Sequence, residues 1–119
     1  MKKLLQSIKY TIVGLKTAIR SERSMKFHLF FTVLVFIAGG LFRISIVEWV
    51  LVSICVGMVI SLEIVNTAIE RLVDVVSTER RPELGQIKDI AGGAVLVGAI
   101  IAVIVGALIF LPKIIGLIF

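Results

Sequence analysis

Three long apolar stretches dominate the pattern of this chain. A helix needs roughly 20 mostly apolar residues to cross about 30 Å of hydrocarbon, and each stretch reaches that length once its flanks are included. The predicted membrane-spanning helices cover residues 26–46, 47–76 and 88–111. Pro82 and Gly85 mark the expected break between the second and the third. The pattern therefore predicts an all-α integral membrane protein in a single domain.

Residues 1–25 precede the first span and follow a different pattern. Their apolar side chains recur at alternating spacings of three and four, which is typical of one face of a helix. Four cations fall within a narrow sector of the same helix, where they can meet anionic headgroups. We therefore expect an amphipathic helix that lies on the membrane surface. Its apolar positions are Leu5, Ile8, Ile12, Leu15 and Ile19, and its basic positions are Lys2, Lys9, Lys16 and Arg20.

Composition agrees with a membrane protein. Of the 119 residues 59% are hydrophobic, which is too large a share for the water-exposed surface of so small a chain. The net charge of +5 could suggest nucleic acid, but the cations lie beside the spans, so nucleic acid is not expected as a partner. The single cysteine, Cys55, lies within a span, where we expect a small buried apolar side chain.

The cations also predict an orientation. Lysine and arginine gather before the first span and in the connection after the second, whereas the other connection holds only Arg43 and the C-terminal end only Lys113. The positive-inside rule then places the N-terminus and the second connection in the cytoplasm. Three spans leave the C-terminus outside.

The second span carries a polar stripe. Glu63, Asn66, Glu70 and Asp74 fall within a sector of about 80° when successive residues are turned by about 100°. A carboxylate at the centre of a membrane helix costs roughly 2.5 to 3.5 kcal/mol on insertion scales, so such groups face a protein interior or a watery cavity. Two interpretations stay open from this span alone: the stripe pairs with cations of neighbouring helices, or it holds a hard cation.

Further polar residues reach the same level of the membrane, namely Glu22 before the first span and Lys88 and Asp89 before the third. Mg²⁺ prefers oxygen ligands and a lysine can neutralise phosphate, which together suit phosphoryl transfer from MgATP. A deeper carboxylate could accept a proton from a lipid hydroxyl. The sequence has neither a GxxxxGK[ST] loop nor the HRD and DFG triplets of protein kinases, so the nucleotide site would be unconventional.

A function of another class, a small ion or proton transporter or an assembly factor, is the alternative. A transporter would need polar groups that continue across the membrane. Residues 49–60 offer only Ser53 and Cys55, so the stripe stops half way. This asymmetry favours an active site at one interface.

Two motifs in this region resemble the signature of the prokaryotic diacylglycerol kinase and undecaprenol kinase family. They are Glu63-Ile-Val-Asn66-Thr-Ala-Ile-Glu70-Arg-Leu-Val-Asp74 and Lys88-Asp89-Ile-Ala-Gly-Gly-Ala-Val-Leu. The resemblance covers most of the chain. It implies a homotrimer in a bacterial cell membrane, with active sites built by neighbouring subunits at the cytoplasmic interface, and transfer of the γ-phosphoryl group of MgATP to a lipid hydroxyl.

The resemblance also implies roles for single residues. Glu63 would be the general base and, with Asn66, would contact the lipid substrate. Glu22 and Glu70 would be Mg²⁺ ligands. The nucleotide and its phosphates would be bound by these two carboxylates together with Asn66, Lys88 and Asp89, or Asp89 would instead position Lys88. Asp74 matches an acid of the family to which we assign no role.

The choice of lipid depends on the segment Glu22-Arg-Ser-Met-Lys-Phe-His28. It resembles the Gram-positive members of the family, which phosphorylate undecaprenol, whereas the Gram-negative diacylglycerol kinases have glutamate at the position of His28. We therefore expect undecaprenol as the substrate, with diacylglycerol as the alternative. No role is assigned to His28, because a lone histidine at an interface is more often structural, although neutral imidazole can bind a substrate or a nucleotide.

Overall fold

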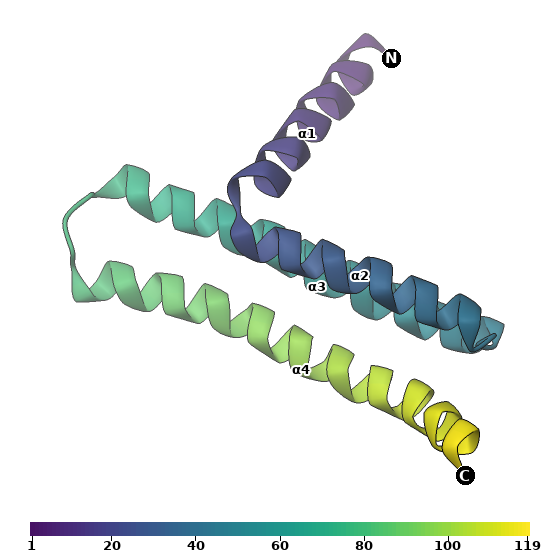
Figure 1. Cartoon of the computed structure of the whole chain (residues 1–119). Coiled ribbons are helices and arrows are strands. Elements are labelled where there is room, and N and C mark those ends of the chain that lie inside the picture. The colour runs from purple at the N-terminus through teal and green to yellow at the C-terminus, as the bar shows by residue number, and fades with distance from the viewer.

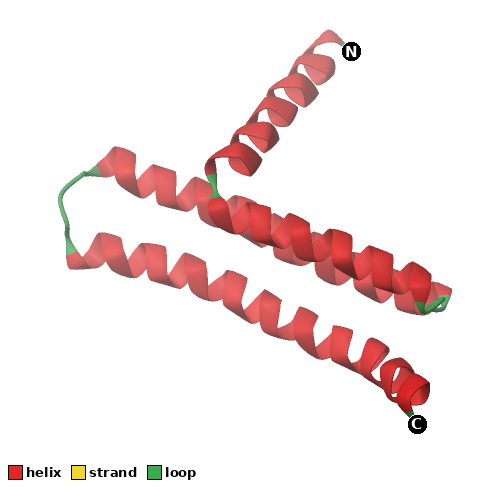
Figure 2. Cartoon of the chain, viewed as in Figure 1, coloured by secondary structure: helices red, strands yellow, loops and turns green.

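The computed structural model of the chain is a bundle of long helices. It describes the backbone of residues 1–119 and the side chains of residues 1–20 and 22–119. Within this described part the chain forms helices and short loops and no strand (Figure 2). The helices are α1 (Lys2–Ser21), α2 (Arg23–Leu41), α3 (Ile46–Val76) and α4 (Pro82–Ile118). The prediction of an all-α fold is confirmed.

Helix α3 is the centre of the bundle. It contacts α2 on one side and α4 on the other, while α1 projects away from the bundle and meets α2 and α3 beside the start of α2, part-way along α3 (Figure 1). Within the described residues, α2, α3 and α4 are long and apolar enough to cross a membrane. The chain is therefore a multi-pass membrane protein. We call the end of the bundle at residues 42–45 the turn end, and the end at residues 77–81 the loop end.

Helix α2 ends at Leu41, before the end of the predicted span at Ile46. The backbone N–H of Ile44 donates to the carbonyl oxygen of Gly39 at 3.1 Å, and that of Arg43 donates to Gly40 at 3.3 Å. Arg43 has a φ of 51°, so this pair of bonds is the left-handed helix end known as a Schellman motif. Glycine usually occupies that position, and its absence explains why the sequence pattern did not reveal the end.

Helix α3 begins with a capping box. The N–H of Glu48 donates to Oγ of Ser45 at 3.2 Å, and the N–H of Ser45 donates to Oε1 of Glu48 at 2.9 Å. The second carboxylate oxygen of Glu48, Oε2, accepts a hydrogen bond from Nζ of Lys113 on α4 at 2.6 Å. A single carboxylate therefore caps α3 and ties its first turn to the last turns of α4.

Helix α4 extends beyond the predicted span of residues 88–111 at both ends. Pro82 occupies the first helical turn, where its fixed φ suits a helix and its missing N–H is not needed, and Gly85 lies inside the helix instead of ending one. At the other end the helix continues through Pro112. There Nζ of Lys113 donates to the carbonyl oxygen of Ile109 at 3.1 Å, in the turn that the proline ring disturbs.

The packed core lies at the turn end. Ile44, Val52 and Ile109 are buried there, and two aromatic pairs surround them: Phe36 stacks on Trp49 with ring centroids 5.6 Å apart, and Phe42 meets Phe110 edge to face at 6.0 Å. Helices α2 and α4 both pack on α3, and their backbones do not approach each other closely in the described structure. The polar stripe lies on α3 toward the loop end.

Candidate active site

The polar stripe on α3 changes from buried to exposed along its length. Glu63 and Asn66 are buried, with 4% and 8% of their surfaces exposed, whereas Glu70 is half-buried and Asp74 is exposed. Between them the hydroxyl of Thr67 donates to the backbone carbonyl of Glu63 at 2.9 Å, so this buried polar group is satisfied within the helix. The deep end of the stripe is thus enclosed by protein, and its shallow end faces the loop end of the bundle.

Glu63 meets a partner that the sequence left without a role. Nε2 of His28 on α2 lies 3.4 Å from Oε2 of Glu63, and the side chain of Glu63 is 6% exposed while that of His28 is 23% exposed. A carboxylate in such an environment needs a donor nearby, because an unpaired buried charge is costly. The signal that could have identified this pair is the polarity of His28 at the start of the mostly apolar part of α2.

Asn66 joins Glu63 to the shallow part of the stripe. Its Nδ2 donates to Oε1 of Glu70 at 3.2 Å, one turn further along α3. The carboxylate can only accept, so the nitrogen of the amide must face Glu70 and the oxygen must point elsewhere. That oxygen, Oδ1, is buried and has no hydrogen-bond partner among the described residues. Asn66 thus presents a free acceptor beside Glu63.

Lys88 reaches α3 from α4. Its Nζ donates to Oδ1 of Asp74 at 2.7 Å. The interpretation that the stripe pairs with cations of neighbouring helices is thus correct for Asp74, but Glu70 is held by Asn66. Beside the Asp74–Lys88 pair is a hollow of about 410 Å³, formed by the end of α3, the loop and the start of α4, and Arg80 and Arg81 also line it. Both arginines belong to the cations of the second connection, which the sequence analysis used only to predict the orientation.

The predicted site residues Glu22 and Asp89 make no hydrogen bond or ion pair with the polar stripe among the described residues of one chain. Glu22 lies half-buried at the junction of α1 and α2, and Asp89 is exposed on α4. Among the side chains that the structure describes, no three histidine, cysteine or acidic residues gather closely enough to hold a metal ion. The oxygen donors of Glu70 and Asn66 nevertheless suit Mg²⁺, which needs only one or two protein carboxylates when phosphate and water complete its shell.

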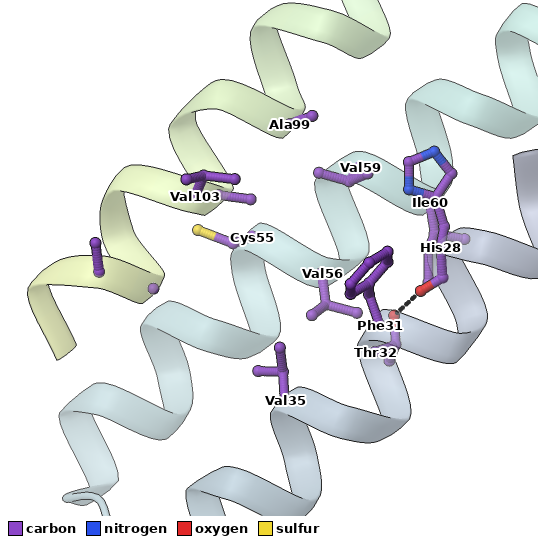
Figure 3. Close-up of a pocket in the computed structure, with 13 residues that line it drawn as sticks. His28, Phe31, Thr32, Val35, Cys55, Val56, Val59, Ile60, Ala99 and Val103 are labelled. Carbon is purple, nitrogen blue, oxygen red and sulfur yellow. Dashed lines mark hydrogen bonds between the residues drawn. The ribbon is translucent and has the colours of Figure 1, made fainter. Parts of the chain in front are cut away.

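An apolar groove begins beside His28. It has a volume of about 440 Å³ and runs over α3 between α2 and α4. Figure 3 shows side chains of all three helices along it, with the ring of His28 at one end and the sulfur of Cys55 on its wall. The lining includes Phe31 and Val35 on α2, Val59 on α3, and Ala102 and Gly106 on α4. The groove therefore connects the level of the buried carboxylate with the apolar depth of the bundle.

The small residues of α4 serve two purposes in this arrangement. Gly98 packs against α3 so closely that a Cβ atom there would lie 2.9 Å from Cδ1 of Leu62, the neighbour of Glu63. Ala102 and Gly106, one and two turns further along, line the groove, and a Cβ atom at Gly106 would meet no atom within 4 Å. Gly98 is thus part of a packing seam, whereas Ala102 and Gly106 leave space for the groove.

All candidate site residues lie in the part of the chain that matches one protein family. The profile of the prokaryotic diacylglycerol kinase family matches residues 9–110. The chain is 43% identical over 100 residues to the undecaprenol kinase of Bacillus subtilis (strain 168), which covers 84% of this chain and 81% of that protein. It is 36% identical over 115 residues to a diacylglycerol kinase of Synechocystis, and this match covers 96% of this chain and 66% of the relative. It is 29% identical over 108 residues to a diacylglycerol kinase of Haemophilus influenzae, with 90% of this chain and 92% of the relative covered.

Proposed function

We propose, starting from the fact that this chain belongs to the prokaryotic diacylglycerol kinase family, that it is a membrane lipid kinase which transfers the γ-phosphoryl group of MgATP to the hydroxyl of undecaprenol. Its similarity to the Bacillus subtilis undecaprenol kinase favours this lipid. Diacylglycerol is the second candidate, because the other relatives carry that name. The family match over residues 9–110 favours a kinase over a transporter or an assembly factor.

The observation that carries the proposal is a buried carboxylate at the head of an apolar groove. Glu63 is 4% exposed, and His28, which contacts it, also lines the groove. A lipid alcohol whose tail lies in the groove would bring its hydroxyl to this carboxylate. The hydroxyl oxygen forms a bond to the γ-phosphorus of ATP while the bond from that phosphorus to the bridging oxygen breaks, and Glu63 takes the hydroxyl proton. The products are the lipid phosphate and ADP.

The polar residues toward the loop end suit the nucleotide. Lys88, Arg80 and Arg81 line the hollow beside α3, together with Asp74 and Glu79, which pair with Lys88 and Arg81. The remaining positive charge would attract the phosphates of ATP. The free oxygen of Asn66 lies between this hollow and Glu63 along the helix and can accept a hydrogen bond from either substrate. Asp74 holds the ammonium of Lys88 in place. We assign Asp89 to the nucleotide as well, because it follows Lys88 on the same helix.

Glu70 and Glu22 are the proposed Mg²⁺ ligands. Glu70 lies one turn beyond Asn66 and one turn before Asp74, which lines the hollow, and its contact with the amide of Asn66 leaves carboxylate lone pairs free. When bound as MgATP, the cation neutralises the negative charge that develops on the phosphates. Among the described residues of one chain, Glu22 makes no hydrogen bond or ion pair with the stripe, and we propose that it serves a site completed by a second subunit.

Orientation and assembly are part of the same proposal. We place the N-terminus and the loop end in the cytoplasm, where ATP is present, and the C-terminus outside. Helix α1, with Leu5, Ile8 and Ile12 exposed and lysines on another face, would lie along the cytoplasmic surface of the membrane. The protein would be a homotrimer, as its resemblance to the family implies, and a neighbouring subunit could then complete the Mg²⁺ site.

The experiment that tests this function is a phosphorylation assay with purified protein in lipid. Undecaprenol and diacylglycerol are offered in parallel with MgATP to the wild type and to Glu63→Gln, Glu70→Gln and Val65→Leu. The last variant changes an exposed side chain on the same helix and serves as the control. Labelling of undecaprenol by the wild type and Val65→Leu supports the proposal, and labelling of diacylglycerol alone moves the protein to the second candidate. If neither lipid is labelled above Glu63→Gln, the kinase assignment is wrong.

The two acidic variants separate the proposed roles. Glu63→Gln should lower kcat by about 10²-fold to 10⁴-fold and leave MgATP binding intact, because the amide cannot accept the proton. Glu70→Gln should instead weaken the Mg²⁺-dependent binding of ATP, measured by titration calorimetry. Equal losses of MgATP binding in both variants would contradict the division of roles.

A further inference from the structure

His28 is placed to control the buried carboxylate of Glu63. It lies near the start of α2, on the side that packs against α3, and its Nε2 is 3.4 Å from Oε2 of Glu63. The backbone carbonyl of His28 accepts a hydrogen bond from the hydroxyl of Thr32 at 2.7 Å, and this bond is drawn in Figure 3. The imidazole therefore projects from a regular part of the helix, which limits the positions that its ring can take.

The chemistry of the pair determines which form of the ring faces Glu63. A carboxylate can only accept hydrogen bonds, so the nitrogen turned toward it must carry a proton. The distance of 3.4 Å is longer than the usual range of about 2.7 to 3.2 Å for an N–H···O bond. Contacts of this kind are often loose without substrate and shorten when the substrate binds. His28 can thus direct the carboxylate and still allow it to take up a proton.

The position of the ring also links the carboxylate to the groove. The side chain of His28 lines the apolar groove together with Phe31 and Val35 of the same helix. In Figure 3 its ring stands at one end of the groove, beside Ile60 of α3. The hydroxyl of a lipid that lies in the groove would therefore pass this ring before it reaches Glu63.

We propose that His28 is a positioning residue for the general base. Its Nε2–H holds one oxygen of the Glu63 carboxylate, so that the other oxygen is turned to the hydroxyl that arrives from the groove. Without this donor the carboxylate would be buried beside an apolar groove with no partner from α2, and it would turn toward other donors. This role rests on the proposed function, because it requires that Glu63 takes the proton of a lipid alcohol.

Substitutions that differ in the position of a single N–H group test this role. The amide nitrogen of His28→Gln can reach the place of Nε2, whereas the shorter side chain of His28→Asn places its nitrogen near that of Nδ1. Both variants keep a polar residue, and His28→Leu removes the donor altogether. Phe30→Leu, on the exposed side of α2, is the control for a change in the same helix.

The readout is the separation of kcat from the KM values of undecaprenol and MgATP, measured on folded protein. We expect His28→Asn and His28→Leu to lower kcat by about 10-fold to 100-fold with an unchanged KM for MgATP, and His28→Gln to recover most of the loss. A purely structural role would predict equal defects in the three variants.

The proposal is overturned if His28→Leu or His28→Asn keeps the wild-type kcat. It is also overturned if the kcat of His28→Gln is as low as that of His28→Asn. These results leave the kinase assignment intact, because the wild type still labels the lipid. Should the wild type label no lipid, the proposed function fails first, and the role of His28 fails with it.

Discussion

Gly39 lies in a contact at the turn end that leaves no space for a side chain. A Cβ atom at this position would lie 2.6 Å from Cη2 and 3.0 Å from Cζ2 of Trp49, and 3.1 Å from Cδ1 of Ile44. The indole cannot move away easily, because it stacks on Phe36 with an interplanar angle of 14°. Gly40, the next residue on α2, has no atom within 4 Å of the same virtual Cβ. The pair therefore offers a test with a built-in control.

The expected magnitude follows from the difference between the two positions. Both glycines are helical, so alanine at either one reduces the conformational freedom of the unfolded chain and should stabilise the fold by about 0.4 to 1 kcal/mol. Gly40→Ala should show this gain alone. Gly39→Ala adds an overpacking cost of about 1 to 3 kcal/mol, because Trp49 or the backbone of α2 must shift. The difference in the free energy of unfolding between the variants should thus be about 1 to 3 kcal/mol.

The assay is equilibrium unfolding in mixed micelles of dodecyl maltoside and sodium dodecyl sulfate, followed by the fluorescence of Trp49, the only tryptophan in the chain. The kinase rate is measured in parallel under folding conditions. We expect Gly39→Ala to lower the unfolding midpoint relative to Gly40→Ala while kcat stays unchanged, because the contact lies at the turn end and Glu63 does not. Equal midpoints would show that the close approach of Gly39 and Trp49 does not limit stability.

Three further predictions concern other parts of the molecule. Lys113→Met and Glu48→Gln should each lower the unfolding midpoint. The double variant should lose less stability than the sum of the two single losses, because both substitutions remove the same hydrogen bond. Additive losses of stability would contradict this coupling. Asp74→Asn should raise the KM for MgATP, since Lys88 loses the partner that holds its ammonium; unchanged kinetics would exclude this role. Alkylation of Cys55, the single cysteine, by a membrane-permeant maleimide should slow when undecaprenol fills the groove but not when ATP is added; equal rates would place the lipid elsewhere.

The helical architecture could be predicted because its causes are local. Apolar runs of sufficient length must form helices in lipid, where each backbone polar group needs a partner within the segment. The polar stripe from Glu63 to Asp74 is also local, since helical periodicity alone places its members on one face. The ends of the helices were harder to predict. The turn after α2 uses Arg43 in a left-handed conformation, without the glycine that normally signals it.

The contacts of the site depend on how the helices meet, and no periodicity along one helix contains that information. The sequence indicated that Glu63, Asn66, Glu70 and Lys88 share a region, but not that Asn66 binds Glu70 or that Lys88 binds Asp74. Whether Glu22 and Glu70 share one Mg²⁺ ion stays a prediction. The predicted roles of these residues still require the kinetic tests described above.

By itself the sequence determined that this chain crosses a membrane with three helices and carries acids and an amide on one face of the second. Both properties follow from composition and helical spacing. Only the tertiary structure decided that His28 faces Glu63 and that α2, α3 and α4 enclose an apolar groove. The physical reason is that these features arise between helices, where the packing of Gly39, Gly98 and the core at the turn end sets how closely each pair can approach.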